Sequence, residues 1–125
     1  MKIYRFDAAV GRKIDAFDSV NFVMSKVVHL TAKARVSCAH LGPNGRIGHH
    51  KAVVPQLLLL VVQGAGWVRG EAADRIPVAV GHAVYWEQDE WHETSTDTGL
   101  MAIVIESEAF APADFMPPSE TANRS

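Results

Sequence analysis

The sequence predicts an all-β fold with little helix, and three of its features support this prediction. Short apolar or alternating segments recur along the chain, turn-forming glycine, proline and asparagine separate them, and no segment has a long helical period. A chain of this kind forms a barrel or a two-sheet sandwich, because both arrangements leave few strand edges exposed. Its 125 residues are enough for one domain with a single core.

Eight to ten short strands are expected along the chain. Residues 34–41 form a strand that ends at the turn signal Gly42-Pro43-Asn44-Gly45, and the apolar run 57–62 is too short for a typical helix. Gly64-Ala65-Gly66 is expected to be a turn that separates this run from a return strand. Residues 7–18 have mixed charge and are expected to be loop. In chain order, the other expected strands cover residues 2–6, 20–24, 26–30, 67–69, 76–80, 83–86, 92–96 and 101–106.

Composition and charge argue against several classes of protein. The formal net charge is −2, without a cluster of Lys and Arg, so no nucleic-acid partner is expected. The longest strongly apolar run, Leu57–Val62, is far shorter than the roughly 20 residues of a membrane-spanning helix, so no membrane association is expected. The N-terminus lacks the apolar segment of a secretory signal, and Cys38 is the only cysteine. We therefore expect no disulfide and a cytoplasmic location.

Residues 81–96, GHAVYWEQDEWHETST, contain the clearest functional signal in the chain. A strand-like run leads into a charged turn, and a histidine follows that turn with aromatic residues nearby. The spacing of Gly81, Glu87, Asp89, His92 and Thr96 follows the pattern G-x5-P-x-G-x2-H-x3-N, which is the second motif of the cupin family. In this segment the chain resembles a small single-domain cupin, although only the glycine and the histidine match by residue type.

The first cupin motif, G-x5-H-x-H-x(3,4)-E-x6-G, is matched more loosely. Gly42 or Gly45 supplies its first glycine, the pair His49-His50 its histidines, and Gly64 its last glycine. The family's metal-binding glutamate falls on Leu57. The resemblance therefore implies a reduced ligand set for a divalent transition metal such as Zn, Ni, Fe or Mn. Its candidate members are His50 and His92, with His49 as the alternative to His50 and Gln56 as a tentative third ligand.

The resemblance covers roughly residues 30–106 and implies a cupin jelly-roll β-barrel that forms a homodimer. It divides the chain into N-terminal strands or an arm (1–30), a barrel core (31–108) and a partly flexible C-terminal tail (109–125). Phe110 and Phe115 in the tail are expected to dock on the barrel or on a partner.

His92 is the candidate catalytic residue. Its imidazole is expected to titrate near neutrality and to transfer a proton, with or without a metal. A neighbouring carboxylate, Glu90 or Glu93, would raise its pKa. The alternative is that His92 caps the turn 87–90. His49 and His50 are adjacent, so in a strand only one of them faces inward, and both being exposed loop residues is the alternative.

Four further residues are candidates for contacts with a small-molecule ligand. His40 shares a strand face with Cys38 and enters the pocket if that face lines the interior. Trp86 and Trp91 flank the motif turn and are candidates for a pocket rim or a dimer contact, although core packing is the more common role of tryptophan. Glu90 lies in the turn itself.

Two functions are compatible with these residues and with the resemblance. The first is a small cytoplasmic enzyme that holds a compact polar molecule in the barrel, with an isomerase, epimerase, lyase or dioxygenase reaction at His92 and His50 and with a metal if one binds. The second is a non-catalytic sensor or carrier that binds a small ligand and has lost the metal. The leucine at the glutamate position supports the second function.

Overall fold

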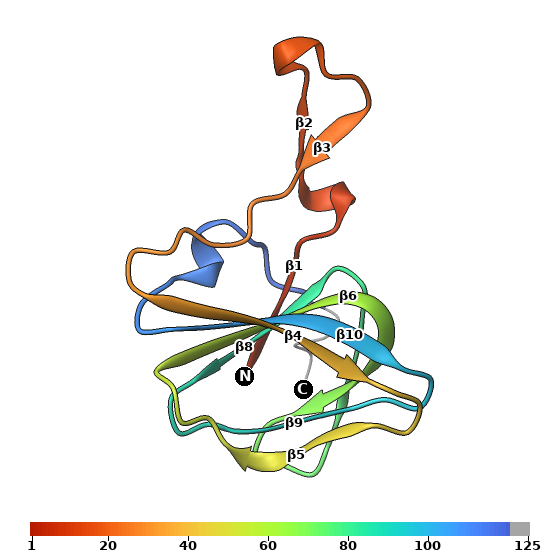
Figure 1. Cartoon of the computed structure of the whole chain (residues 1–125), viewed down its shortest axis with the longest axis vertical. Helices are drawn as coiled ribbons and strands as arrows, with labels where there is room; N and C mark the ends of the chain where they lie inside the picture. Colours follow the sequence, from red (N-terminus) through yellow and green to blue (C-terminus); the bar gives the residue numbers. More distant parts are fainter. Residues whose placement is uncertain (121–125) are drawn as a thin grey trace.

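β-strands account for most of the regular structure in the computed structural model of the chain, which describes residues 1–120 (Figure 1). The strands are β1 (Lys2–Arg5), β2 (Arg12–Ile14), β3 (Phe22–Met24), β4 (Ala34–Leu41), β5 (Arg46–Lys51), β6 (Gln56–Arg69), β7 (Ile76–Ala79), β8 (His82–Glu87), β9 (Trp91–Ser95) and β10 (Leu100–Ser107). The three 3₁₀ turns are η1 (Ala8–Val10), η2 (Ala16–Asp18) and η3 (Pro112–Asp114). The predicted all-β class with little helix is confirmed. None of the helical turns in residues 1–120 is long and apolar enough to span a bilayer.

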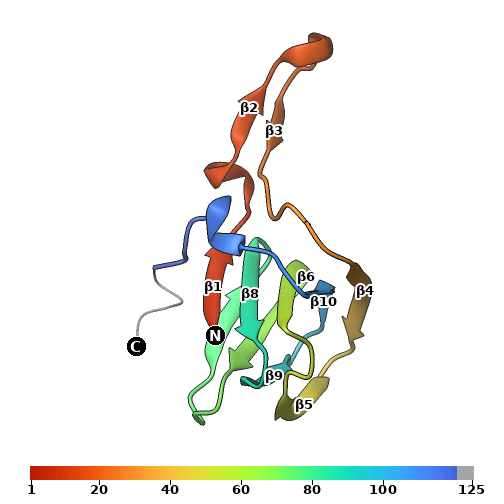
Figure 2. The ribbon, with the colours of Figure 1, turned by 90° about the vertical axis from the view of Figure 1, so that its left-hand side faces the viewer.

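Eight antiparallel strands build the barrel from two facing layers. One layer has the order β1-β8-β6-β10-β4, and in the other β5 pairs with β9, β9 with β6, and β6 with β7. Strand β6 belongs to both layers, because its first half pairs with β8 and β10 and its second half with β7 and β9. Figure 2 shows β8, β6 and β10 side by side above the β5–β9 pair.

The expected turn at 64–66 is wrong, because β6 continues through it. Gly64 has a φ of +80° and joins the two halves of one strand of 14 residues. A Cβ on Gly64 would lie 2.2 Å from the carbonyl oxygen of Gly99. Only glycine combines this left-handed backbone with such a close approach. Gly64 therefore bends β6 from one layer into the other rather than ending it.

Three further expectations differ from the structure. Residues 26–30 form no strand, because they pair with no other strand among the described residues, although Val27 and Val28 pack against the outer face of the β1-β8-β6-β10-β4 layer. Residues 7–18, expected as loop, contain β2. Strand β5 was not among the expected strands, since its residues are mostly polar and its strand conformation depends on pairing with β9.

Apolar side chains form two clusters, one on each face of the β1-β8-β6-β10-β4 layer. The inner cluster lies between the two layers and contains Ile3, Leu59, Val61, Val68, Val78, Val84, Trp86, Leu100 and Ala102. The outer cluster lies on the opposite face and contains Tyr4, Leu58, Leu60, Ala83, Tyr85, Ile105, Phe110 and Met116. This alternation follows from the two-residue period of a strand, since adjacent residues of β6 and β8 point to opposite faces.

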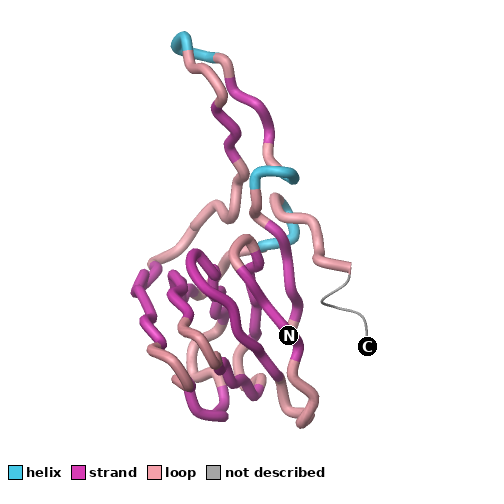
Figure 3. Tube along the Cα trace, turned by 90° about the vertical axis from the view of Figure 1, so that its right-hand side faces the viewer, coloured by secondary structure: helices cyan, strands magenta, loops and turns pink. Residues whose placement is uncertain are grey.

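The expected division at residue 30 has to be corrected. Residues 2–5 form β1, which pairs with β8 and so belongs to the barrel. Residues 8–30 form an arm whose β2–β3 hairpin projects from the barrel (Figures 2 and 3), while Val27 and Val28 near its end pack on the outer cluster. Residues 109–120 pack on the outer cluster through Phe110 and Met116, whereas Phe115 is 40% exposed. The flexibility expected for the end of the tail, residues 121–125, falls outside the described residues.

Candidate functional site

The turn between β8 and β9 positions the two central side chains of the site. Trp86 lies near the end of β8 and His92 near the start of β9, and both point into the barrel. The turn between them has Asp89 at a φ of +68°, and β8 follows Gly81 at a φ of +97°. Both positions correspond to glycines of the second cupin motif, so the motif predicts the backbone conformation even where Asp89 replaces glycine.

His50 and His92 come together across the β5–β9 pair. They are direct partners in its register, and the centroids of their rings are 4.2 Å apart. The ring of His92 also lies 5.0 Å from that of Trp86. His50 is exposed, His92 is 5% exposed and Trp86 is fully buried. The three rings therefore form a continuous path from the protein surface into the inner cluster.

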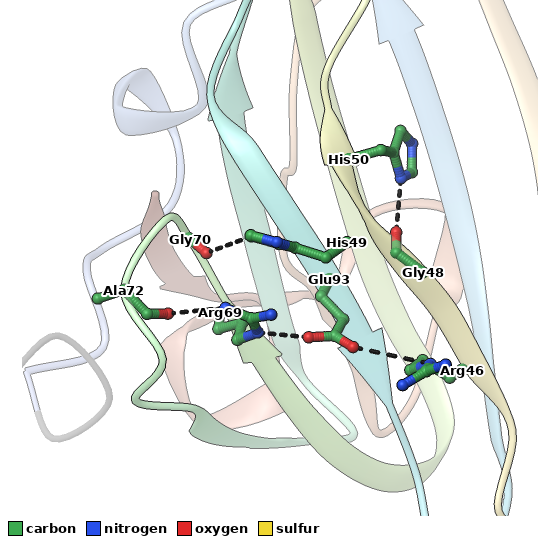
Figure 4. A network of polar contacts seen from close by, with 8 residues as sticks. All are labelled: Arg46, Gly48, His49, His50, Arg69, Gly70, Ala72 and Glu93. Atoms are coloured by element: carbon green, nitrogen blue, oxygen red, sulfur yellow. Dashed lines mark hydrogen bonds and ion pairs between the residues drawn. The ribbon is translucent and has the colours of Figure 1, made fainter.

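His49 does not belong to this path. Figure 4 shows His49 and His50 pointing to opposite sides of β5. His49 donates from Nε2 to the carbonyl oxygen of Gly70, at 3.0 Å, and its ring contacts Trp91. His50 donates from Nδ1 to the carbonyl oxygen of Gly48, at 2.6 Å, which leaves its Nε2 as the acceptor nitrogen. His49 is thus held on the outside by its own contacts.

His92 is an uncharged imidazole at neutral pH. Burial, and then the charges of His50 and His49, lowers the pKa of His92 to about 4. The expected rise in its pKa from Glu90 or Glu93 is wrong, because both carboxylates are engaged elsewhere. Glu93 points outward to Arg69, as Figure 4 shows, and the hydrogen bond from Arg69 lowers the pKa of Glu93. A proton transfer by His92 near neutral pH is therefore not favoured.

Three buried polar atoms on the inner face have no hydrogen-bond partner among the described residues. They are Trp86 Nε1, His92 Nε2 and Thr94 Oγ1, here called the inner polar trio. Thr94 is 1% exposed and shares the inward face of β9 with His92. Buried polar atoms in folded proteins nearly always pair with protein, water or ligand, since leaving one unpaired costs about 1 to 3 kcal/mol. The trio is therefore a set of buried donors and acceptors that a water or a small polar ligand could pair with inside an apolar barrel.

Thr94 was not predicted as a site residue. Its position two residues after His92 could have identified it, because residues two apart in a strand share a face and His92 is expected to point inward. Thr96 on the same face provides the contrast. Its hydroxyl donates to the carbonyl oxygen of Ala65, at 2.6 Å, and accepts from the amide of Gly99, at 3.0 Å. Thr96, which stands at the asparagine position of the motif, is therefore a structural residue.

Two of the predicted site residues, His40 and Gln56, lie away from the trio. His40 and Cys38 are exposed, because they lie on the side of β4 that points away from the inner cluster. On that side their neighbours in β10 are Met101 and Ile103, of which Ile103 packs on the outer cluster. Gln56 also points outward, and its Oε1 accepts a hydrogen bond from the amide of Phe110. These placements follow from strand parity, since in each case the adjacent residue in the strand is the one that faces inward.

The remaining ligand-contact candidates have other roles. Glu90 accepts from the amide of Glu87, at 3.1 Å, and pairs with the amine of Met1, so it holds the turn and the start of β1. Trp91 points outward against His49, with the Lys51 ammonium 5.8 Å from its ring. Trp86 does contact His92, but it lies inside the core rather than on a rim.

The donor set does not fit a divalent transition metal. Zinc sites use three or four protein ligands, and the candidate ligands here reduce to the imidazoles of His50 and His92. In the described part of the chain, no three His, Cys, Asp or Glu side chains are placed to hold one ion. Leu57, at the position of the family's glutamate, pairs with Trp86 and packs on the inner cluster. An apolar side chain therefore occupies the place of the missing ligand.

A separate apolar cavity of about 440 Å³ lies outside this site. Trp67, Pro77 and Ala79 of the β6–β7 pair line it, together with His82 and the loop residue Asp97. His82 uses its Nδ1 to accept from the amide of Ala79, at 3.0 Å. No member of the inner polar trio lines this cavity, so it offers none of the unpaired buried polar atoms that mark the candidate site.

Solved structures with the same strand arrangement identify the fold. An uncharacterised conserved protein with a double-stranded β-helix domain from Klebsiella pneumoniae has a TM-score of 0.57 at 16% identity, over 70% of this chain and 81% of that one. A cupin superfamily protein from Desulfitobacterium hafniense has a TM-score of 0.56 at 12% identity, over 71% and 80%. This chain has the cupin fold.

The same comparison includes a protein whose name suggests an activity. A predicted oxalate decarboxylase from Thermotoga maritima has a TM-score of 0.55 at 20% identity, over 60% of this chain and 67% of that one. No protein-family model matches the sequence, and no curated protein matches it significantly. At these identities the likeness extends to the cupin jelly-roll barrel and not to its chemistry.

Proposed function

We propose that this cupin binds a compact, uncharged polar molecule inside its barrel, without a metal, as a small-ligand binding or sensor module. The inner polar trio carries this proposal. Trp86 supplies a donor, the Thr94 hydroxyl donates or accepts, and the Nε2 of His92 does either according to its tautomer. Apolar side chains of the inner cluster surround these groups, which is the usual composition of a small-molecule site.

The charge of the site argues for a neutral ligand. With its low pKa, His92 is uncharged at pH 7, and Trp86 and Thr94 carry no charge. A carboxylate or phosphate ligand would be buried beside the trio without a compensating cation, which is costly. For this reason the oxalate chemistry suggested for the Thermotoga protein is not transferred here.

A metal-dependent reaction at His50 and His92 is the less supported alternative. Two imidazoles without a carboxylate or third histidine would hold a transition metal weakly. His50 is better suited to contact a ligand at the outer end of the ring path, where its exposed Nε2 accepts a hydrogen bond. A cytoplasmic location forms part of the proposal, since Cys38 is an exposed free thiol.

The test is an NMR titration of the indole N–H resonances, with that of Trp86 assigned from Trp86→Phe. The probes are glycerol, acetamide and 1,2-propanediol as neutral compounds, and acetate and oxalate as charged ones. We expect the Trp86 resonance to shift with at least one neutral probe and to remain unchanged with both anions. Thr94→Val should abolish the shift, while Thr98→Val on an exposed loop should leave it intact.

Two outcomes would contradict the proposal. The first is a Trp86 resonance that none of the neutral probes moves. The second is saturable binding of Zn, Ni, Fe or Mn that requires His92 and protects the fold against heat, which would restore the metal-dependent alternative. Thermal unfolding of protein purified without an affinity tag, with and without each metal, measures the second outcome.

A further inference from the structure

The arm, residues 8–30, contacts its own barrel only near its end, among the described residues, where Val27 and Val28 pack on the outer cluster and the Ser25 hydroxyl donates to the carbonyl oxygen of Phe6. Its strands β2 and β3 pair only with each other and form a separate two-stranded sheet. Figures 1 and 3 show this hairpin extending away from the barrel. An isolated two-stranded hairpin is at best marginally stable in water. The arm therefore lacks the second surface that such a hairpin needs.

The arm also exposes an unusual amount of apolar side chain. Phe17 at its tip is fully exposed and Val20 is 80% exposed. Phe22, Val23 and Met24, which make up β3, are between 37% and 48% exposed. Scattered single apolar residues on a surface are normal, but a contiguous apolar segment of this kind marks an interaction site.

The barrel has an apolar face that is exposed in the described part of the chain. Among residues 1–120, strand β4 pairs only with β10, so its other edge is free. Along it, Val36 is 61% exposed and Cys38 is exposed, and they share a side with Met101 and Ile103 of the neighbouring strand. We call this surface the outer β4 face. It adjoins the outer cluster, but Phe110 and Met116 cover the part of that cluster on β1, β8 and β6.

The total exposed area exceeds that of a compact monomer of the same mass. The chain exposes 7717 Å², whereas a compact monomer of 13.6 kDa exposes about 6,600 Å². One side of a standard interface buries about 800 Å². The excess of roughly 1,100 Å² is therefore large enough for one stable dimer contact per copy.

We infer that this protein is a homodimer in which the arm of each copy docks on the outer β4 face of the other. One chain carries both the unsupported apolar arm and the uncovered face, and a two-fold axis satisfies both contacts at once. A free strand edge also accepts an added strand through its backbone groups. Within one copy the hairpin of the arm points away from its own barrel (Figure 2). It can therefore reach the outer β4 face only on a second copy.

Sedimentation velocity on three variants tests this inference. Phe17→Ser combined with Val20→Ser removes the apolar tip, and Val36→Arg places a charge on the outer β4 face. We expect each to weaken dimerisation at least tenfold relative to wild type, without a change in the circular dichroism spectrum. Val80→Arg, at an equally exposed position in the β7–β8 connection, is the matched control and should leave the dimer unchanged.

A mixing experiment separates arm docking from other dimers. A heterodimer of the arm variant and the Val36→Arg variant retains one intact contact, between the unmodified arm and the unmodified face. Because the two substitutions then meet in a single broken contact, native mass spectrometry should detect more heterodimer than the two homodimer affinities predict. The thiol of Cys38 should also react more slowly with Ellman's reagent in the wild-type dimer than in the Val36→Arg monomer.

Three outcomes would overturn the inference. The first is a wild-type protein that remains monomeric at the highest concentration of an NMR sample, since the arm would then serve another partner. The second is a dimer that Val80→Arg disrupts and the arm and face variants do not. The third is a mixture of variants without excess heterodimer. The neutral-ligand titration uses the barrel interior, so its result and this one are independent.

Discussion

The rings of His50 and His92 face each other across a strand pair, with their centroids 4.2 Å apart, although one side chain is exposed and the other is buried. This relationship links the surface of the barrel to its inner polar trio. It also explains part of the low pKa of His92, because a charge on His50 disfavours a second charge nearby. The contacts around this pair, and the barrel that holds it, support five predictions.

Thr94→Val is expected to stabilise the unliganded protein. The substitution replaces an unpaired buried hydroxyl with a methyl group of similar shape, so the free energy of unfolding should rise by about 1 kcal/mol. Thr96→Val is the matched control on the same strand, and it should lower that free energy by about 1 to 3 kcal/mol because two hydrogen bonds are lost. Urea unfolding measures both. A loss of stability in Thr94→Val would mean that its hydroxyl is paired in solution.

The stability of the protein should fall as the pH decreases from 7 to 4. His92 has a pKa of about 4 in the folded protein and near 6.5 when unfolded, so the unfolded state takes up the proton first. The contribution of the neutral His92 to the free energy of unfolding is fully present above about pH 6.5 and is lost as the pH falls towards 4. It amounts to a few kcal/mol. Urea unfolding of wild type and His92→Gln at several pH values isolates this effect. The control His40→Gln should keep the wild-type pH dependence.

His50→Ala is expected to leave the fold intact while changing the site. Because the side chain is exposed, the free energy of unfolding should change by less than about 0.5 kcal/mol. The pKa of His92 should rise, since one of the charges that lowers it is removed. Binding of the neutral probe should weaken. An NMR titration of the His92 ring reports the pKa directly, and an unchanged value would exclude coupling between the two rings.

Gly64→Ala should be among the most damaging single substitutions in the barrel. A left-handed backbone costs a non-glycine residue about 1 to 2 kcal/mol, and the new methyl group would collide with the Gly99 carbonyl. We expect a loss of at least about 2 kcal/mol, measured by urea unfolding. Gly42→Ala is the control, because its added Cβ meets no atom within 4 Å and its φ is not positive. Equal stability of the two variants would refute the role of Gly64 as the bend in β6.

Glu93→Gln should weaken the outer side of the β5–β9–β6 layer. The Glu93 carboxylate accepts a hydrogen bond from Arg69 of β6 and lies 3.8 Å from Arg46 of β5 (Figure 4). The loss should be about 1 kcal/mol and should shrink at high salt, since part of the contact is electrostatic. Glu71→Gln, in an exposed hairpin tip, should have no effect. A salt-independent loss would indicate packing rather than charge.

The sequence by itself determined the fold class and the position of His92. Alternation and turn residues predicted most of the barrel strands, and the bounds of β4 were predicted correctly at 34–41. The spacing of the second motif predicted a charged turn followed by a histidine that can point inward, and it placed Asp89, whose φ is +68°, at a glycine position of the motif. These features are local, because strand parity and turn chemistry depend on residues close together in the chain.

The tertiary structure decided the contacts that depend on which strands pair. Only the β5–β9 register brings His50 beside His92, and only the parity of β6 and β4 turns Gln56 and His40 outward. The unpaired hydroxyl of Thr94 and the paired one of Thr96 are not distinguished by residue type, because the acceptor of the Thr96 hydroxyl, the carbonyl of Ala65, is 31 residues away in the chain. A one-residue change in register reverses which side chains face the interior, and long-range pairing alone selects it.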